Sequence, residues 1–222
     1  MYKTIILGLL LLATGSSCGI FPETLQTKQS SDLEGRRIRR IAVLPPVISV
    51  PAPAPSVPFG AAPVVRASEK EAPESLARYT HAAMAALPNW QVVSESEVRE
   101  AVISVPPSSE EARLKRVGEM VYADAVMMAR VQRFRERVGD EWGAKSPASV
   151  AFILDLVDVR RGDIIWTARF DETQKSLSES IFSLGDISQR GVRWLSADQL
   201  AQEGVKKAIG QLHDILSRRP AS

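Results

Sequence analysis

The chain has 222 residues, of which 45% are hydrophobic and 24% are charged, and its formal net charge is +2. This length suits one globular domain with short appendages, large enough to bury a core without disulfides. A charge so close to zero excludes the strongly basic surface of a typical nucleic-acid-binding protein, so we expect no nucleic-acid partner.

The first 17 residues have the pattern of a secretory signal. One lysine precedes an apolar run over residues 5–13, about half of the roughly 20 residues that a transmembrane helix needs. Small residues then lead to Cys18, the single cysteine of the chain. An exported protein with one unpaired thiol carries an oxidation liability, which a lipid thioether on the sulfur would remove.

Residues 14–18 resemble the lipobox of bacterial lipoproteins, in which the cysteine is acylated and becomes the first residue after cleavage; Gly15 stands where the commonest lipobox has Leu. The resemblance implies that residues 1–17 are removed and that acylated Cys18 holds the chain in the lipid bilayer. Several acyl chains anchor far more firmly than one. Gly19 stands where lipoproteins retained at the inner membrane usually have Asp, which implies the periplasmic face of the outer membrane.

After Cys18 the sequence is polar and short of large apolar side chains, which predicts a tether. About 20 extended residues reach at most about 70 Å. A cluster of four arginines lies at the end of this segment: Arg36, Arg37, Arg39 and Arg40. We interpret it as a solvated entrance to the first strand rather than as a contact with headgroups or a partner. The predicted boundaries are a signal over 1–17, a tether over 18–37, a domain over 38–217 and a tail over 218–222.

The first strand is predicted within residues 38–47, where Pro45 and Pro46 end it. A proline-rich stretch follows, and we predict a long loop over 45–65 inside the domain, because a lone strand beyond an interdomain linker would have no sheet to join. Two interpretations of this loop stay open. It is either a spacer or a partner-binding element, in which case the binding residues are Phe59, Pro53, Pro55 and Pro58.

Helical spacing predicts four helices. The first has Pro73 in its first turn, the second is capped by Ser94, and the third starts at a capping box of Ser108 and Glu111. The last helix begins after Ser196, also with a capping box, and runs to about residue 217. Its predicted buried stripe is Ala201, Val205, Ala208, Leu212 and Ile215.

Between the third and the last helix the apolar period changes from helical to two. Strands are predicted over 123–134, 149–159 and 163–170, and the second and third form an antiparallel hairpin with a tight turn at Gly162. The predicted inward faces of this hairpin are Val150, Phe152, Leu154 and Leu156 on one strand, and Ile164, Trp166, Ala168 and Phe170 on the other.

This order of elements indicates an α/β (α+β) domain, with a mixed sheet, an antiparallel C-terminal meander, helices on one or both faces and a C-terminal helix. Residues 38–46, 117–134 and 154–170 resemble the small α/β domain of a group of bacterial envelope lipoproteins and related proteins. The group comprises the curli-secretion (CsgG-like) proteins, the lipoprotein activators of penicillin-binding proteins and the amino-terminal domain of the Tol-system periplasmic protein. Residues 171–200 extend beyond the shared pattern.

No residue set has the pattern of a catalytic site. Lipid would consume Cys18, while His81 and His213 lie on predicted helices without a motif around them. Asp171 and Glu172 follow a strand, which favours a solvated turn over an acid–base pair. Metal-ligand spacings and a Gly-rich phosphate loop are also missing from the sequence, so we expect no enzyme activity, cofactor or metal.

We therefore expect an outer-membrane-anchored periplasmic lipoprotein that acts as a non-enzymatic adaptor or assembly factor, with an unidentified envelope protein as partner and with homo-oligomers possible. One alternative is a subunit of a curli-type secretion channel, which needs membrane-spanning segments that neither 45–65 nor 171–195 supplies. The other is an activator of a peptidoglycan synthase, for which a reach of about 70 Å is short.

Overall fold

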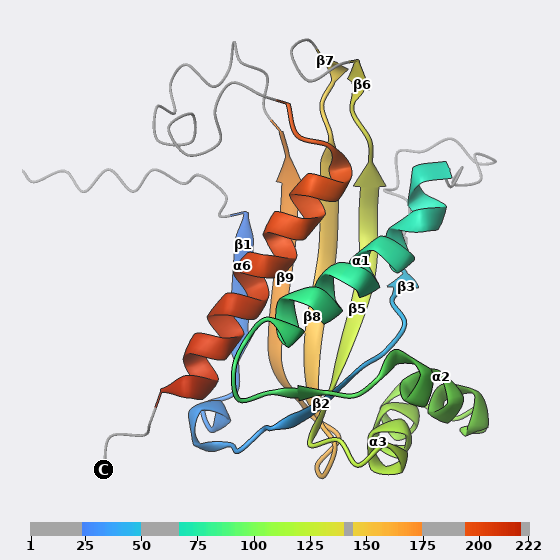
Figure 1. Cartoon of the computed structure of the whole chain (residues 1–222), viewed down its shortest axis with the longest axis vertical. Coiled ribbons are helices and arrows are strands. Elements are labelled where there is room, and N and C mark those ends of the chain that lie inside the picture. Colours follow the sequence, from blue (N-terminus) through green and yellow to red (C-terminus); the bar gives the residue numbers. More distant parts are fainter. Residues whose placement is uncertain (1–23, 50–66, 140–143, 175–193, 219–222) are drawn as a thin grey trace, which may run out of the picture.

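The computed structural model describes residues 24–49, 67–139, 144–174 and 194–218. They form one mixed α/β domain around a central sheet (Figure 1), which confirms the predicted fold class. The strands are β1 (Leu25–Gln29), β2 (Arg40–Val43), β3 (Val47–Ile48), β4 (Gln91–Val92), β5 (Ala125–Arg135), β6 (Val138–Gly139), β7 (Ala144–Ser146), β8 (Ser149–Asp158) and β9 (Ile164–Thr173).

The sheet is antiparallel on one side and parallel on the other. Its strand order is β1-β9-β8-β5-β2-β4, with β3 also paired to β5, while β6 and β7 form a separate two-stranded ribbon. The β1-β9, β9-β8 and β8-β5 pairs are antiparallel, and β2 runs parallel to both β5 and β4. The two prolines end β2 as predicted, but parallel pairing to β5 resumes beyond them at β3.

The described helices are α1 (Ala67–Ala85), α2 (Glu95–Ser104), α3 (Glu110–Met120) and α6 (Ala197–Ser217), with a short 3-10 turn at η1 (Leu33–Gly35). Ser94 caps α2 and the Ser196–Gln199 capping box starts α6, both as predicted. Two predictions were wrong. The cap of α3 is Ser109, whose hydroxyl accepts the Ala112 N–H, and α1 begins early enough to place Pro73 beyond its first turn.

Helices α1 and α6 cover one face of the sheet (Figure 1) and bury the larger core. All five predicted stripe residues of α6 are buried, and so are Phe152 and Trp166. Phe152 stacks on Phe170 with ring centroids 5.0 Å apart. At Gly204 the helix lies so close to the sheet that a Cβ atom would stand 2.9 Å from the Phe170 ring.

Helices α2 and α3 lie on the opposite face and cover only its end nearest β2 and β4. Leu114 and Val117 of α3 pack there against Val126, Val157 and Val159. The backbone of α3 comes close at Gly118, where a Cβ atom would stand 2.3 Å from a methyl group of Val159. Beyond these two helices, no described helix covers this face of the sheet.

The predicted tether over 18–37 is wrong for its second half. Residues 25–29 form edge strand β1, paired with β9, and Leu25 and Leu33 are buried in the core. The polar composition concealed this strand because its other four side chains are exposed. Leu25 is only seven residues beyond Cys18, which is at most about 25 Å of extended chain.

The β8-β9 hairpin forms as predicted, with Gly162 at φ +78° in its turn. One inward residue was assigned wrongly: the register shifts between Leu156 and Val157, so Ile164 is 51% exposed and Ile165 is buried instead. Strand β9 also continues to Thr173, which makes Asp171 and Glu172 strand residues and not part of a turn.

Candidate functional site

The residues singled out from the sequence as sites lie outside the described ranges. This holds for Cys18 and for the four residues of the proline tract, Pro53, Pro55, Pro58 and Phe59. Of the segment 171–195, the structure describes only residues 171–174 and 194–195. The geometry of a candidate site therefore comes from other residues.

The sheet face that α2 and α3 leave uncovered carries arginines along β5. Arg130, Arg133 and Arg135 all point to this face, although the spacing from 130 to 133 is odd. They share a face because the register shifts between Val131 and Arg133, which adds one residue to β5 as in a β-bulge. We call this surface the open face; the exposed side chain of Arg169, on β9, also lies on it.

One carboxylate on the open face is buried and fully engaged. Asp155 is 1% exposed, forms an ion pair with Arg130, and accepts a hydrogen bond of 2.7 Å from the Thr167 hydroxyl. Arg130 also reaches Glu110 of α3, with 3.4 Å between the charged atoms. A buried carboxylate is costly unless it is paired, and Arg130 and Thr167 supply the partners that Asp155 needs.

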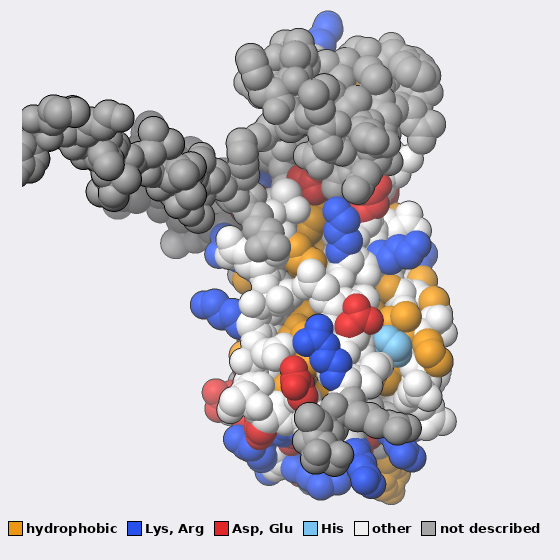
Figure 2. Space-filling model, turned by 90° about the vertical axis from the view of Figure 1, so that its left-hand side faces the viewer, with side chains coloured by type: hydrophobic (Ala, Val, Ile, Leu, Met, Phe, Trp, Pro, Cys, Tyr) orange, Lys and Arg blue, Asp and Glu red, His pale blue; other side chains and the backbone are white. Residues whose placement is uncertain are grey.

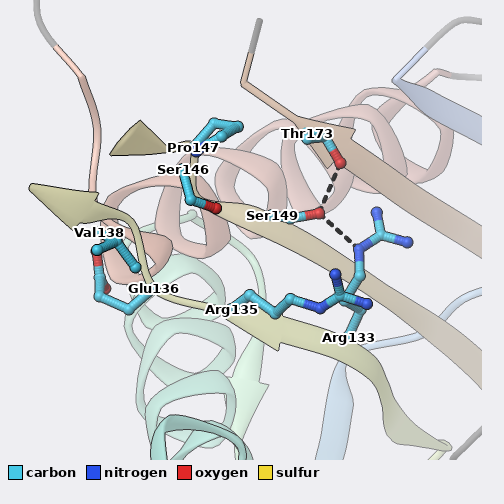
Figure 3. Close-up of a pocket in the computed structure, with 8 residues that line it drawn as sticks. All are labelled: Arg133, Arg135, Glu136, Val138, Ser146, Pro147, Ser149 and Thr173. Carbon is cyan, nitrogen blue, oxygen red and sulfur yellow. Dashed lines mark hydrogen bonds between the residues drawn. The ribbon is translucent and has the colours of Figure 1, made fainter. Parts of the chain in front are cut away.

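A hollow of about 450 Å³ lies at one end of the open face (Figure 3). It stands where β5 and β9 end and β8 begins, next to the β6-β7 ribbon. We call it the arginine hollow. Its lining residues are Arg133, Arg135, Glu136, Val138, Ser146, Pro147, Ser149 and Thr173.

Hydrogen bonds hold one side of the arginine hollow in place. The Arg133 Nε–H donates to Ser149 Oγ over 2.6 Å, and the Ser149 and Thr173 hydroxyls share a bond of 2.6 Å (Figure 3). Arg133 also forms an ion pair with Asp171. Arg135 is exposed and has no ion-pair partner among the described residues. The arginine hollow therefore has fixed polar walls and one cation, Arg135, for which the described residues supply no partner.

Glu136, which lines the arginine hollow, is hydrogen-bonded to the start of α6. Glu136 accepts the Ala197 N–H at the start of α6 over 3.0 Å, and its other oxygen accepts the Arg137 N–H over 3.0 Å. A carboxylate at a helix N-terminus is favourable because of the helix dipole. Glu136 keeps its charge, so the lining contains two arginines and one carboxylate, and the carboxylate is bonded to backbone N–H groups and not to the arginines.

Strand β1 enters the sheet beside this hollow. The Asp171 N–H donates to the Thr24 carbonyl over 2.9 Å, and Leu25 pairs with Phe170. The same Asp171 binds Arg133 through its side chain. Thr24 is thus connected through Asp171 to Arg133, which lines the arginine hollow.

The arginines before β2 lie at the opposite end of the sheet. Arg36 pairs with Asp32 and Asp158, Arg161 of the hairpin turn also pairs with Asp32, and Arg37 is exposed. Lys and Arg side chains gather at the lower end of the molecule in Figure 2. The Arg36 guanidinium holds the pKa of Asp32 at about 2. Local ion pairing is consistent with the predicted strand entrance.

The two histidines lie on helices and are partly exposed, as expected for residues at the boundary between core and surface. Burial lowers the pKa of His81 on α1. His213 on α6 lies 3.2 Å from the Pro88 carbonyl through Nε2 and packs edge-on against Trp90. Within the described ranges, no three His, Cys, Asp or Glu residues are grouped to hold a metal ion. No described helix combines the length and apolarity needed to cross a membrane.

Sequence reasoning missed the arginine hollow, although part of its signal was present. The sequence shows arginines interspersed with apolar residues, at Arg130, Arg133 and Arg135. The prediction used only the apolar residues, as the signal of a strand. Ser149 and Thr173 carry no local signal. They meet because the hairpin register pairs them across β8 and β9.

Comparisons with known proteins give a likeness of fold. No family model matches the chain, and no curated protein matches it. The solved structures that resemble it include the PelC dodecamer from Paraburkholderia phytofirmans, at 14% identity over 85% of this chain and 97% of that chain, with a TM-score of 0.45. Lipoprotein GNA1162 from Neisseria meningitidis is 15% identical over 68% of this chain and 94% of that chain, with a TM-score of 0.42.

The LpoB C-terminal domain from Escherichia coli is 16% identical over 63% of this chain and 87% of that chain, with a TM-score of 0.39. These similar structures thus include a bacterial lipoprotein, in line with the resemblance stated from the sequence. At such identities, and with TM-scores below 0.5, these similarities carry no argument about what this chain binds or does.

Proposed function

We propose that the chain is an outer-membrane-anchored periplasmic lipoprotein that acts as a non-enzymatic adaptor or assembly factor in the cell envelope. The observation that carries the proposal is the short stretch between Cys18 and the domain. Leu25 is already buried and paired with Phe170, so the stretch between the acylated cysteine and the domain spans at most about 25 Å. A domain held so closely works at the membrane surface.

The entry of β1 also orients the domain. Thr24 is hydrogen-bonded to Asp171, next to Arg133 of the arginine hollow. An anchor at Cys18 therefore places the arginine hollow near the bilayer and the β8-β9 turn away from it. The open face extends between these two ends, and we propose it as the surface on which the adaptor meets its protein partner.

The short tether bears on the peptidoglycan-synthase alternative. An activator of that kind has to reach an enzyme of the inner membrane, and a reach of about 25 Å is less suited to this than the 70 Å expected from the sequence. A homo-oligomer remains compatible with the adaptor, because an assembly factor can act as several copies. The partner and the number of copies are the quantities to measure.

Site-specific photo-crosslinking in the native envelope tests the adaptor proposal. A photoreactive residue replaces Arg169, exposed on the open face, and in a matched control replaces Gln211, exposed on α6. We expect one defined foreign envelope protein from position 169 and not from 211. Self-crosslinks in a regular ladder would favour a secretion-channel subunit instead, and the absence of any product from both positions would contradict the adaptor.

A further inference from the structure

We propose that the arginine hollow is a phosphate-binding site that docks the headgroup phosphate of anionic lipid in the membrane to which the chain is anchored. The assignment of a lipid rests on the proposed function, since only the short tether puts this end of the domain near a bilayer. The assignment of a phosphate rests on the geometry of the arginine hollow itself.

The two arginines of the arginine hollow have more N–H donors than hydrogen bonds to described protein groups. Arg133 uses Nε for Ser149 and Nη2 for Asp171, which leaves Nη1 without a described partner. Arg135 has no described partner for any of its five N–H groups. Both side chains line the same 450 Å³ hollow, because they lie two residues apart on one strand face.

The hydroxyl pair supplies one more donor. Ser149 and Thr173 together have two O–H hydrogens, and their mutual bond uses one of them, whichever hydroxyl is the donor. Arg133 donates to Ser149 and therefore consumes neither hydrogen. One O–H is thus left to point at an acceptor, and Ser149 itself is only 5% exposed, so its position is fixed by the protein.

These groups match a tetrahedral oxyanion. Guanidinium groups bind phosphate with two parallel hydrogen bonds, and a neighbouring hydroxyl can contact a third oxygen. Glu136 keeps its negative charge, but its two oxygens accept the backbone N–H groups of Ala197 and Arg137, and no described bond joins it to Arg133 or Arg135. A phosphate in the arginine hollow would neutralise Arg135, the cation that lacks a partner in the described structure.

The test uses the full chain in a non-ionic detergent and follows the arginine Nε–H signals by NMR, assigned with Arg133→Lys and Arg135→Lys. Three probes are titrated: inorganic phosphate, a short-chain phosphatidylglycerol and the matching short-chain phosphatidylcholine. We expect phosphate and phosphatidylglycerol to shift the Arg133 and Arg135 signals saturably, and phosphatidylcholine to do so more weakly, because its choline offsets the phosphate charge.

Arg135→Gln should weaken binding of both anions about tenfold or more, since a charged hydrogen-bonding partner is lost. Arg169→Gln, on the same face outside the arginine hollow, should leave binding unchanged. Saturable shifts with inorganic phosphate but none with phosphatidylglycerol would overturn the proposal that the ligand is a lipid, and would indicate a soluble phosphate compound as the ligand instead. If none of the three probes produces a saturable shift, the proposal of a phosphate-binding site is overturned. Because detergent replaces the membrane, these outcomes do not depend on whether Cys18 is acylated.

Discussion

The two faces of the sheet differ in how they are covered and in what they can do. The face under α1 and α6 is closed by two long helices and buries the largest side chains, among them Trp166, Phe152 and Phe170. The described helices cover the opposite face at one end only, and its remainder carries arginines that pair with few carboxylates, or with none, among the residues the structure describes. Stability therefore comes mainly from the first face, which leaves the open face available for binding.

Charge on the open face is tolerated because antiparallel strands commonly have one solvated side. Helices α2 and α3 cover this face over the parallel strand β2, where Ala42 and the nearby Val93 are buried. The parallel strand β3 lies outside this cover, and its residues Val47 and Ile48 are 51% and 42% exposed.

The largest effect is expected on the closed face. Phe152→Ala removes a ring that is 1% exposed and stacked on Phe170, and should lower the free energy of unfolding by about 3–5 kcal/mol. Chemical denaturation followed by circular dichroism measures this loss. A loss below about 1 kcal/mol would mean that this face does not supply the main stability.

A pair of glycines on α6 probes how tightly the closed face is packed. Gly204→Ala would push a methyl group to 2.9 Å from the Phe170 ring, which Phe152 backs, so a destabilisation of about 1–3 kcal/mol is expected. Gly210→Ala, in the same helix with no atom within 4 Å of the new Cβ, should instead stabilise by up to about 1 kcal/mol. Equal effects from the two changes would contradict the close approach of α6.

On the open face, removing a buried charge should matter less than removing a core ring. Asp155→Ala leaves Arg130 without its buried partner, but Arg130 is part-exposed and also reaches Glu110. We expect a loss of about 1 kcal/mol, at the lower end of the range for an orphaned polar partner. A denaturation midpoint as low as that of Phe152→Ala would show that the open face is as important for stability as the closed one.

The smallest effect is expected for an exposed arginine of the open face. Arg169→Gln removes no described ion pair, so unfolding free energy should stay within about 0.5 kcal/mol of the wild type. Because the fold should stay intact, a photoreactive residue at the same position can report partner binding without a loss of structure. A clear loss of stability would instead assign Arg169 a structural role.

The parts of this fold that follow from the sequence are those with a local signal. Helix α6 was predictable because Ser196 and Gln199 cap it and its apolar stripe repeats at helical spacing. Strand β1 was not, because one leucine in five residues gives no alternation and its pairing partner, β9, is about 140 residues away. The arginine hollow could not be predicted for the same reason. Its residues meet only because the β5-β8 register shifts between Val131 and Arg133 and because β8 pairs with β9 in the observed register.

The central claim, that the domain is held at the membrane by a short acylated segment, is tested most directly at Cys18. The mature protein is isolated from the envelope, and its N-terminal peptide is measured by mass spectrometry, with Cys18→Ala as the control for labelling by a clickable fatty acid. We predict a chain that begins at Cys18, carries a diacylglyceryl thioether and fractionates with the outer membrane, while the variant is unlabelled. A free Cys18 thiol, or a mature chain that begins at another residue, would contradict the account.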